Sequence, residues 1–181
     1  SNILDVTATV IKKINTKTPT KTNKRIISLL SKIDGWGFGY DNNTNQINVS
    51  KPDAGFTLKT YNNSFKYIND DVLNYFAYFI SDIVEKNISF KFKSINRIHW
   101  NWYHPGSKMQ FHSDESLDKF FSIVYNLHTN DGGTEFNLND KNTFYTSIES
   151  EALFFPSKIQ HKAIAPTKDF NRFSLNIIVN I

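Results

Sequence analysis

The chain has 181 residues, of which 39% are hydrophobic and 15% aromatic, so it is long enough to bury the core of one ordinary domain and too apolar for a disordered chain. Cysteine is absent, which excludes disulfides, thiolate zinc sites, iron–sulfur clusters and cysteine nucleophiles. The net charge is +4, and no apolar run approaches the roughly 20 residues that span a bilayer. Because the first residues also lack a signal-peptide pattern, we expect a soluble, cytoplasmic protein without a membrane partner.

Much of the basic excess lies near the N-terminus. Seven lysines and arginines occur from Lys12 to Lys32, with no acidic residue among them. This basic stretch is either a phosphate-binding arm or a solvated, partly flexible segment, and the absence of interleaved aromatic residues favours the second interpretation. Residues 16–23 resemble a linker, and residues 22–33 are expected to form a short helix. The apolar face of that helix would consist of Ile26, Ile27, Leu29, Leu30 and Ile33.

The segment before residue 90 contains one clear helix and several shorter elements. A polar turn is expected at residues 41–45, and short strands at residues 47–49 and 55–60. The helix covers residues 70–86, where Asn69 or Asp70 can act as the N-terminal cap. Its apolar residues recur at helical spacing, so we expect them to pack against a sheet as core. These residues are Val72, Tyr75, Phe76, Phe79, Ile80 and Ile83.

From residue 90 onward, short alternating or apolar runs follow one another between turn residues. We expect strands at residues 94–103, 109–112, 120–128, 133–138, 152–155, 160–164 and 172–181. Many short strands at this spacing are typical of an antiparallel sandwich or jelly roll. The predicted class is therefore mainly β with N-terminal helices (α+β). It is a single domain in which residues 1–93 form a support and residues 94–181 form the β-rich part that holds the chemistry.

Three residues in the β-rich part have the chemistry of a metal site. His112 and Asp114 are two positions apart, and on a strand such residues point to the same face, so an imidazole and a carboxylate can converge on one ion. His161 is a third candidate ligand that the fold can bring alongside from a later strand. Two histidines and one carboxylate form the facial triad of non-haem Fe(II) oxygenases, which leaves coordination positions open for other ligands.

A polar strand face follows the distal histidine. Arg172 opens a long apolar strand, and alternation along it places Arg172, Ser174 and Asn176 on one face. Polar side chains that point into the interior need hydrogen-bond partners, and beside a metal-bearing strand a bound ligand can supply them. Arginine grips a carboxylate with two parallel hydrogen bonds, and serine adds another, so the pattern indicates a dicarboxylate.

Taken in order, these features resemble the prolyl-4-hydroxylase-like branch of the Fe(II)/2-oxoglutarate-dependent oxygenases. That family has a tyrosine before a glycine-containing turn, an HxD motif, a strand, a Gly-Gly segment, a distal histidine and a basic residue shortly after it. The resemblance covers residues 97–181 and leaves the N-terminal half unmatched. The matching positions are Tyr103, Gly106, His112, Asp114, residues 121–127, Gly132, Gly133, His161, Arg172 and Ser174.

The resemblance implies a double-stranded β-helix (a jelly roll, cupin-like) with iron at its open end. His112, Asp114 and His161 would hold the Fe(II), and 2-oxoglutarate would chelate it as cosubstrate. Arg172, assisted by Ser174, would bind the far carboxylate of 2-oxoglutarate.

The same resemblance implies a reaction and a pocket. Tyr103 and Asn126 would line the cosubstrate pocket, and no catalytic residue is expected beyond the metal and cosubstrate ligands. The reaction would consume O2, release succinate and CO2, and hydroxylate a peptidyl substrate, for example a prolyl side chain, or a small molecule.

Two other functions stay open. A nucleic-acid-modifying 2-oxoglutarate dioxygenase typically has a second arginine where this chain has Ile178, so we expect no nucleic-acid substrate. A non-catalytic, cupin-like metal-binding module would leave Arg172 and Ser174 unexplained. Nothing in the sequence indicates an oligomeric state. The remaining histidines have no partner at ligand spacing and are expected to be surface or strand residues; they are His99, His104 and His128.

Overall fold

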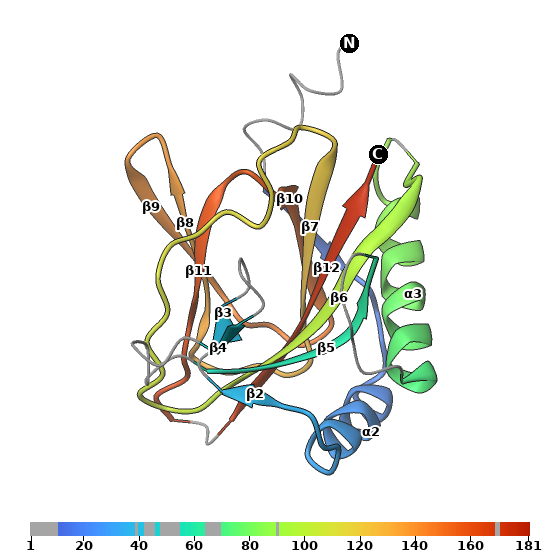
Figure 1. The fold of residues 1–181 in the computed structure, drawn as a ribbon, viewed down its shortest axis with the longest axis vertical. Coiled ribbons are helices and arrows are strands. Elements are labelled where there is room, and N and C mark those ends of the chain that lie inside the picture. The colour runs from blue at the N-terminus through green and yellow to red at the C-terminus, as the bar shows by residue number, and fades with distance from the viewer. Residues whose placement is uncertain are drawn as a thin grey trace.

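Two antiparallel β-sheets face each other in the computed structural model of the chain, and two helices pack on the outside (Figure 1). The structure describes residues 11–38, 40–41, 46–47, 55–63, 70–89, 91–168 and 171–181. The larger sheet has seven strands and the smaller sheet has three. This arrangement is the jelly roll that the strand pattern predicted. Within the described residues, neither helix is long and apolar enough to cross a bilayer.

The larger sheet has the order β1-β10-β7-β12-β6-β5-β2. Its strands are β1 (Lys12–Asn15), β10 (Glu151–Pro156), β7 (Phe120–Asn126), β12 (Arg172–Asn180), β6 (Ser94–Tyr103), β5 (Phe56–Asn62) and β2 (Gly37–Phe38). Strand β12 lies at the centre, is buried along nearly its whole length, and pairs with β6 on one side and β7 on the other. Strands from the N-terminal half therefore extend both edges of a sheet whose centre comes from the C-terminal half.

The smaller sheet has the order β11-β8-β9. Its strands are β11 (Gln160–Ile164), β8 (Gly133–Leu138) and β9 (Lys141–Thr146). Asn139 and Asp140 connect β8 to β9, with φ values of 52° and 60°. Positive φ at two consecutive residues is typical of the tight turn whose twist matches an antiparallel hairpin. A separate two-stranded sheet pairs β3 (Tyr40–Asp41) with β4 (Gln46–Ile47).

The strand predicted at residues 109–112 does not form. Only one bridge connects this segment to the smaller sheet, where His112 lies opposite His161 of β11. The predicted strand at residues 109–112 is short, and a turn that contains Pro105 and Gly106 lies just before it. The segment therefore crosses the edge of the smaller sheet and pairs only at the position that carries a candidate metal ligand.

Helix α3 (Asp71–Lys86) covers the outer face of the larger sheet (Figure 1). The side chain of Asp70 accepts a hydrogen bond from the backbone N–H of Leu73 at 2.8 Å, which caps the helix as predicted. Asn69, the other predicted cap, lies outside the described residues, as do residues 42–45 of the predicted turn and 48–49 of the predicted strand. The apolar residues that α3 buries against the sheet are Leu73, Phe76, Ala77, Ile80 and Val84.

The predicted core stripe of this helix is only partly correct. Phe76 and Ile80 are buried, but Val72, Tyr75 and Phe79 are 60%, 69% and 47% exposed. The helix has apolar residues around most of its circumference, so spacing alone could not show which side faces the sheet. The side of α3 that packs against the sheet is narrower than the predicted apolar stripe, and smaller residues complete its contact with the sheet.

Residues 16–23 were predicted to form a linker, and the structure contradicts this. Thr16 donates from Oγ1 to the carbonyl of Ser150 at 2.8 Å, and Ser150 donates from Oγ to the carbonyl of Thr18 at 2.6 Å. Asn23 is fully buried; it donates from Nδ2 to Ser150 Oγ at 2.9 Å and accepts from the hydroxyl of Tyr125. Polar composition suggested a linker because these side chains are hydrophilic, but they bond one another inside the fold.

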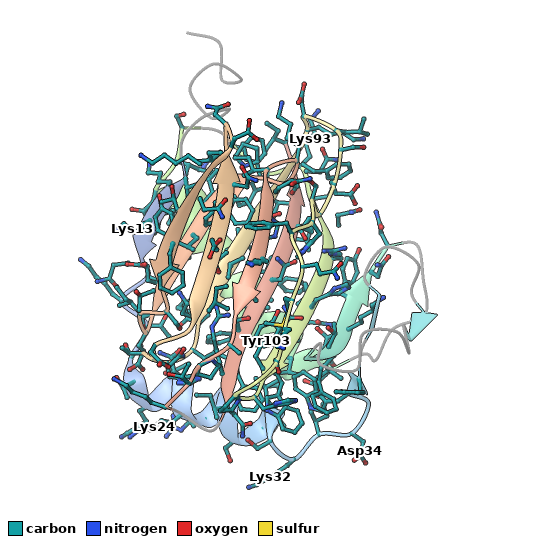
Figure 2. All side chains as sticks on the ribbon, turned by 90° about the vertical axis from the view of Figure 1, so that its left-hand side faces the viewer. Lys13, Lys24, Lys32, Asp34, Lys93 and Tyr103 are labelled. Atoms are coloured by element: carbon teal, nitrogen blue, oxygen red, sulfur yellow. The ribbon has the colours of Figure 1, made fainter. Side chains whose placement is uncertain are left out.

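Helix α2 (Thr20–Leu30) starts two residues earlier and ends three residues earlier than predicted. Its apolar face packs on the core as expected, with Ile26 and Leu30 buried. The basic side chains of α2 lie on the opposite, exposed face, and Figure 2 shows Lys24 at the outer edge of the molecule.

Candidate active site

Backbone pairing brings the two candidate histidine ligands together. His112 N–H donates to the carbonyl of His161 at 3.0 Å, and His161 N–H donates to the carbonyl of His112 at 2.9 Å. Residues paired in this way project their side chains to the same face, and the two imidazole centroids are 4.5 Å apart. Asp114 is fixed by its own N–H, which donates to the carbonyl of Ser157 at 2.9 Å. One potential ligand atom from each of the three side chains lies within 4.8 Å of the others.

Hydrogen bonds to the backbone orient both imidazoles. Nδ1 of His112 lies 3.2 Å from the carbonyl oxygen of Gln110, and Nδ1 of His161 lies 2.9 Å from that of Ile159. A neutral imidazole that donates from Nδ1 keeps the lone pair of Nε2 available for a metal ion. Both Nε2 atoms point at Asp114, at 3.3 Å from Oδ1 for His112 and 3.4 Å from Oδ2 for His161. Two nitrogens and one oxygen in this arrangement suit a divalent metal ion with open coordination positions.

Side chains from three strands of the larger sheet donate hydrogen bonds to the buried carboxylate of Asp114. Arg97 Nη2 lies 3.2 Å from Oδ1, Ser122 donates from Oγ to Oδ2 at 2.7 Å, and Asn176 Nδ2 lies 3.5 Å from Oδ2. Burial acts to raise the pKa of Asp114, but the neighbouring imidazoles and Arg97 outweigh burial and hold this pKa well below its ordinary value. The carboxylate is therefore ionised at neutral pH and able to bind a metal ion.

The triad opens into a cavity of about 40 Å³ between the two sheets. Alternate residues of β6 and β12 line one side, and the strand register pairs Arg172 with Tyr103 and Ser174 with Asn101. Thr134 of β8 lines the side formed by the smaller sheet. The face of β12 predicted to be polar thus points into the cavity, and the apolar face of the same strand packs in the core under α3.

Arg172 is a fully buried cation in this cavity. Its Nη2 donates to Oδ1 of Asn126 at 3.2 Å, and its guanidinium carbon lies 5.5 Å from the centre of the Tyr103 ring. Among the described residues, no acidic side chain pairs with it, and its Nε and Nη1 have no hydrogen-bond partner. Burial lowers the pKa of Arg172 to about 10 and raises that of Tyr103 to about 12, so the first is charged and the second neutral at neutral pH. A buried charge with unused donors calls for an anionic ligand.

Strand β6 contributes cavity residues that sequence reasoning did not assign. Arg97, His99 and Asn101 line the cavity together with Tyr103. His99, expected to be a surface or strand residue, is on a strand but only 2% exposed. Burial, with the positive charges of Arg97 and Lys59, keeps the pKa of His99 well below its ordinary value. The signal was available, because four polar residues alternate from residue 97 to residue 103 on a strand whose other face is apolar.

The Gly-Gly segment has a steric role beside the site. A Cβ atom on Gly133 would lie 2.1 Å from the carbonyl oxygen of Tyr145, and one on Gly132 would lie 2.5 Å from that of Ile164. Both distances are far below van der Waals contact, so β8 can approach its neighbours only without side chains here. The segment therefore sets the position of β8, which carries Thr134 into the cavity.

No family model matches the sequence, and no curated protein matches it either. Solved structures do match over nearly the whole chain. A prolyl-4-hydroxylase from Pseudomonas putida has a TM-score of 0.67 at 13% identity, over 98% of this chain and 95% of that one. A prolyl hydroxylase from Trichoplax adhaerens, in complex with a peptide fragment of the hypoxia inducible factor oxygen degradation domain, has a TM-score of 0.69 at 14% identity, over 98% of this chain and 85% of that one.

A third structure extends the comparison to an enzyme crystallised with a small molecule. HygX from Streptomyces hygroscopicus, with nickel, 2-oxoglutarate and hygromycin B bound, has a TM-score of 0.70 at 9% identity, over 98% of this chain and 84% of that one. The chain therefore has the double-stranded β-helix fold of the 2-oxoglutarate/Fe(II) oxygenases, and the fold predicted from the resemblance is confirmed.

Proposed function

We propose that this chain is an Fe(II)- and 2-oxoglutarate-dependent dioxygenase that hydroxylates a peptidyl substrate, for example a prolyl side chain, or a small molecule. The observation that carries the proposal is the combination of two features in one cavity. A His-Asp-His triad has the donor set of a non-haem iron site, and the buried cation Arg172 has no acidic partner among the described residues. A metal-chelating dicarboxylate satisfies both.

Each side chain has a distinct part in this proposal. His112, Asp114 and His161 hold the metal ion, and Arg172 binds the far carboxylate of 2-oxoglutarate. When bound, Fe(II) with dioxygen and 2-oxoglutarate supplies the oxidising power for hydroxylation, with release of succinate and CO2. The protein fixes the ligands and orients the cosubstrate in a cavity between two sheets.

Three neighbours of Arg172 support its role as the cosubstrate clamp. Asn126 accepts a hydrogen bond from its Nη2, which fixes the guanidinium plane and leaves Nε and Nη1 for a ligand. The neutral phenol of Tyr103 and the hydroxyl of Ser174 line the same end of the cavity. Both can donate to a carboxylate that Arg172 holds.

Two substrate classes agree with the structural neighbours. One neighbour is bound to a peptide fragment and another to hygromycin B. A nucleic-acid substrate is disfavoured because Ile178 is fully buried at the position where repair-type oxygenases have a second arginine. The exposed lysines of α2 can still attract polyanions weakly, so binding to nucleic acid would not by itself identify a substrate.

The test measures succinate formation with added Fe(II) and 2-oxoglutarate. Proline-containing peptides, free amino acids and methylated oligonucleotides are compared as substrates. We expect peptides or small molecules to stimulate succinate formation and oligonucleotides not to do so. Stimulation by an oligonucleotide alone, with a demethylated or hydroxylated product, would contradict the assigned substrate class.

The paired variants Asp114→Ala and Asp118→Ala test the metal site. Asp118 is also an aspartate but is exposed and pairs with Lys158 at 2.6 Å, outside the cavity. Asp114→Ala is expected to abolish metal binding and succinate formation without unfolding the chain, as judged by circular dichroism. Asp118→Ala is expected to keep both. If Asp114→Ala binds the metal ion as tightly as the parent, the proposed ligand set is wrong.

A further inference from the structure

The cavity contains a second buried arginine that the proposed chemistry does not use. Arg97 is 8% exposed and pairs with Asp114 through Nη2 at 3.2 Å, but its Nε has no hydrogen-bond partner among the described residues. Two positions along the same face of β6, His99 is 2% exposed, and its Nε2 also has no partner there. Two residues with an unsatisfied nitrogen thus follow each other along the face of β6 that lines the cavity.

These groups lie away from the arginine proposed to bind the cosubstrate. The strand register pairs Arg172 with Tyr103, and pairs Ile178 with Arg97. Six residues along each strand separate the two pairs, which corresponds to roughly 20 Å between the Cα atoms at about 3.3 Å per residue. The two arginines therefore reach the cavity from positions far apart on the sheet, and Arg97 lies beside the metal triad rather than beside Tyr103.

Metal binding changes the charge balance around Arg97. In the structure, its counter-charge is Asp114, whose other neighbours are the two imidazoles. A metal ion bound by the triad takes up the negative charge of this carboxylate. The divalent ion and the two arginines then carry four positive charges, whereas Asp114 and doubly charged 2-oxoglutarate carry three negative charges. Among the described lining residues and these ligands, one positive charge is left without a counter-charge. A buried cation in that position needs a further anion.

We propose that Arg97 and His99 form an anion subsite that binds an acidic group, a carboxylate or a phosphate, of the prime substrate beside the metal centre. The inference rests on the proposed function, because it is the bound metal ion that removes the counter-charge of Arg97. Nε of Arg97 and Nε2 of His99 donate to the oxyanion, while Nη2 of Arg97 keeps its contact with Asp114. The substrate is accordingly an acid, or a peptide with an acidic group close to the carbon that is hydroxylated.

The first experiment measures anion binding without turnover. The chain is loaded with Zn(II) and 2-oxoglutarate and titrated with inorganic phosphate and with acetate by isothermal calorimetry. We expect the parent to bind at least one of the two, and the preferred anion distinguishes a phosphate from a carboxylate. Arg97→Gln is expected to weaken binding by about ten- to a hundredfold, as for loss of a charged hydrogen bond. His99→Leu is expected to weaken it by less.

The matched control is Arg25→Gln, the same chemical change on the exposed face of α2. It is expected to bind phosphate, Zn(II) and 2-oxoglutarate as the parent does. Because Arg97→Gln removes a contact to Asp114, its Zn(II) affinity is measured separately. His99→Leu leaves the donors of Asp114 intact, so it decides the question if Arg97→Gln does not fold.

The second experiment uses substrates in acid and amide forms, such as proline and prolinamide, and peptides with free or amidated C-termini. The parent is expected to prefer the acid of each pair in succinate formation, and Arg97→Gln to lose that preference. Three results would overturn the subsite: phosphate and acetate fail to bind the loaded parent, they bind both variants unchanged, or they bind only by displacing 2-oxoglutarate. If Zn(II) and 2-oxoglutarate themselves do not bind, the proposed function fails and the subsite with it.

Discussion

At the scale of single residues, two arginines face one cavity in different surroundings. Arg97 has Asp114 as its counter-charge at 3.2 Å, whereas Arg172 contacts an amide and an aromatic ring and no acid among the described residues. A buried guanidinium in the second situation is stable only if the gain from a ligand or from its surroundings offsets the loss of hydration. Arg172 should therefore contribute more to ligand affinity than to the stability of the ligand-free protein.

Arg172→Ala tests this directly. The substitution removes a charge-assisted interaction worth about 1.5–3 kcal/mol, so the 2-oxoglutarate requirement should rise by roughly ten- to a hundredfold. Zn(II) affinity should stay nearly unchanged, because the triad has its own hydrogen-bond partners. The measurements are 2-oxoglutarate binding to the Zn(II)-loaded chain and the 2-oxoglutarate dependence of succinate formation, with Arg25→Ala as control. An unchanged 2-oxoglutarate affinity would mean that Arg172 has another role.

Sequence reasoning placed some cavity residues and not others, for a physical reason. Arg172 and Ser174 stood out because they interrupt a long apolar strand, and inward polar groups there require an explanation. Arg97 and His99 alternate in the same way on β6, but they belong to no motif with a recognised ligand spacing, so the alternation alone was not assigned a role. The contact between Arg97 and Asp114 joins two segments through the fold, and single-sequence spacing contains no information about such a pair.

At the scale of elements, strands with a regular pattern were predicted well. The bounds of β6, β8 and β11 agree with the predicted ranges 94–103, 133–138 and 160–164. Strand β9 was missed because its sequence is polar and mostly exposed. Strand β1 was missed because it is short and lies at the edge of the sheet, where β10 is its partner among the residues that the structure describes. Their positions depend on partners distant in sequence, which propensity cannot supply.

Helix α3 offers a matched pair of phenylalanines. Phe76 is 8% exposed and its ring packs near Trp100 and Tyr125, whereas Phe79 is 47% exposed. Phe76→Ala should lower the free energy of unfolding by about 3–5 kcal/mol, because it leaves a cavity in the core. Phe79→Ala should change it by less than about 1 kcal/mol. Urea denaturation of both variants measures the difference, and equal effects would contradict the orientation of the helix.

A second prediction at this scale concerns residues 16–23, in the N-terminal segment before α3. Asn23 bonds Ser150 and Tyr125 in the interior, so Asn23→Ala leaves buried polar groups without partners. The free energy of unfolding should fall by about 1–3 kcal/mol for a lost partner of this kind. Asn142→Ala, an exposed asparagine of β9, is the control and should have little effect. If Asn23→Ala is as stable as the control, residues 16–23 are not anchored as the hydrogen bonds indicate.

At the scale of the whole molecule, the site joins the two sheets. His161 belongs to the smaller sheet and Arg172 to the larger one, and Asp114 belongs to the segment between β6 and β7 that bridges to the smaller sheet at His112. A ligand bound to residues from both sheets exists only in the folded state, so it must stabilise the fold as a whole. Metal ion and cosubstrate should therefore act on global unfolding, not only on one loop.

Thermal unfolding measured in steps tests this coupling. At a hundred times its dissociation constant, each ligand should add about 2.7 kcal/mol to the stability of the chain. For a chain of this size that corresponds to roughly 5–10 °C in the melting temperature.

Zn(II) alone should give the first increment, and 2-oxoglutarate should give the second only when Zn(II) is present, because it binds partly through the metal ion. Arg172→Ala should keep the first increment and lose most of the second at the same 2-oxoglutarate concentration. Asp114→Ala should lose both. If 2-oxoglutarate raises the melting temperature in the absence of metal, and Arg172→Ala keeps that rise, the dicarboxylate binds elsewhere.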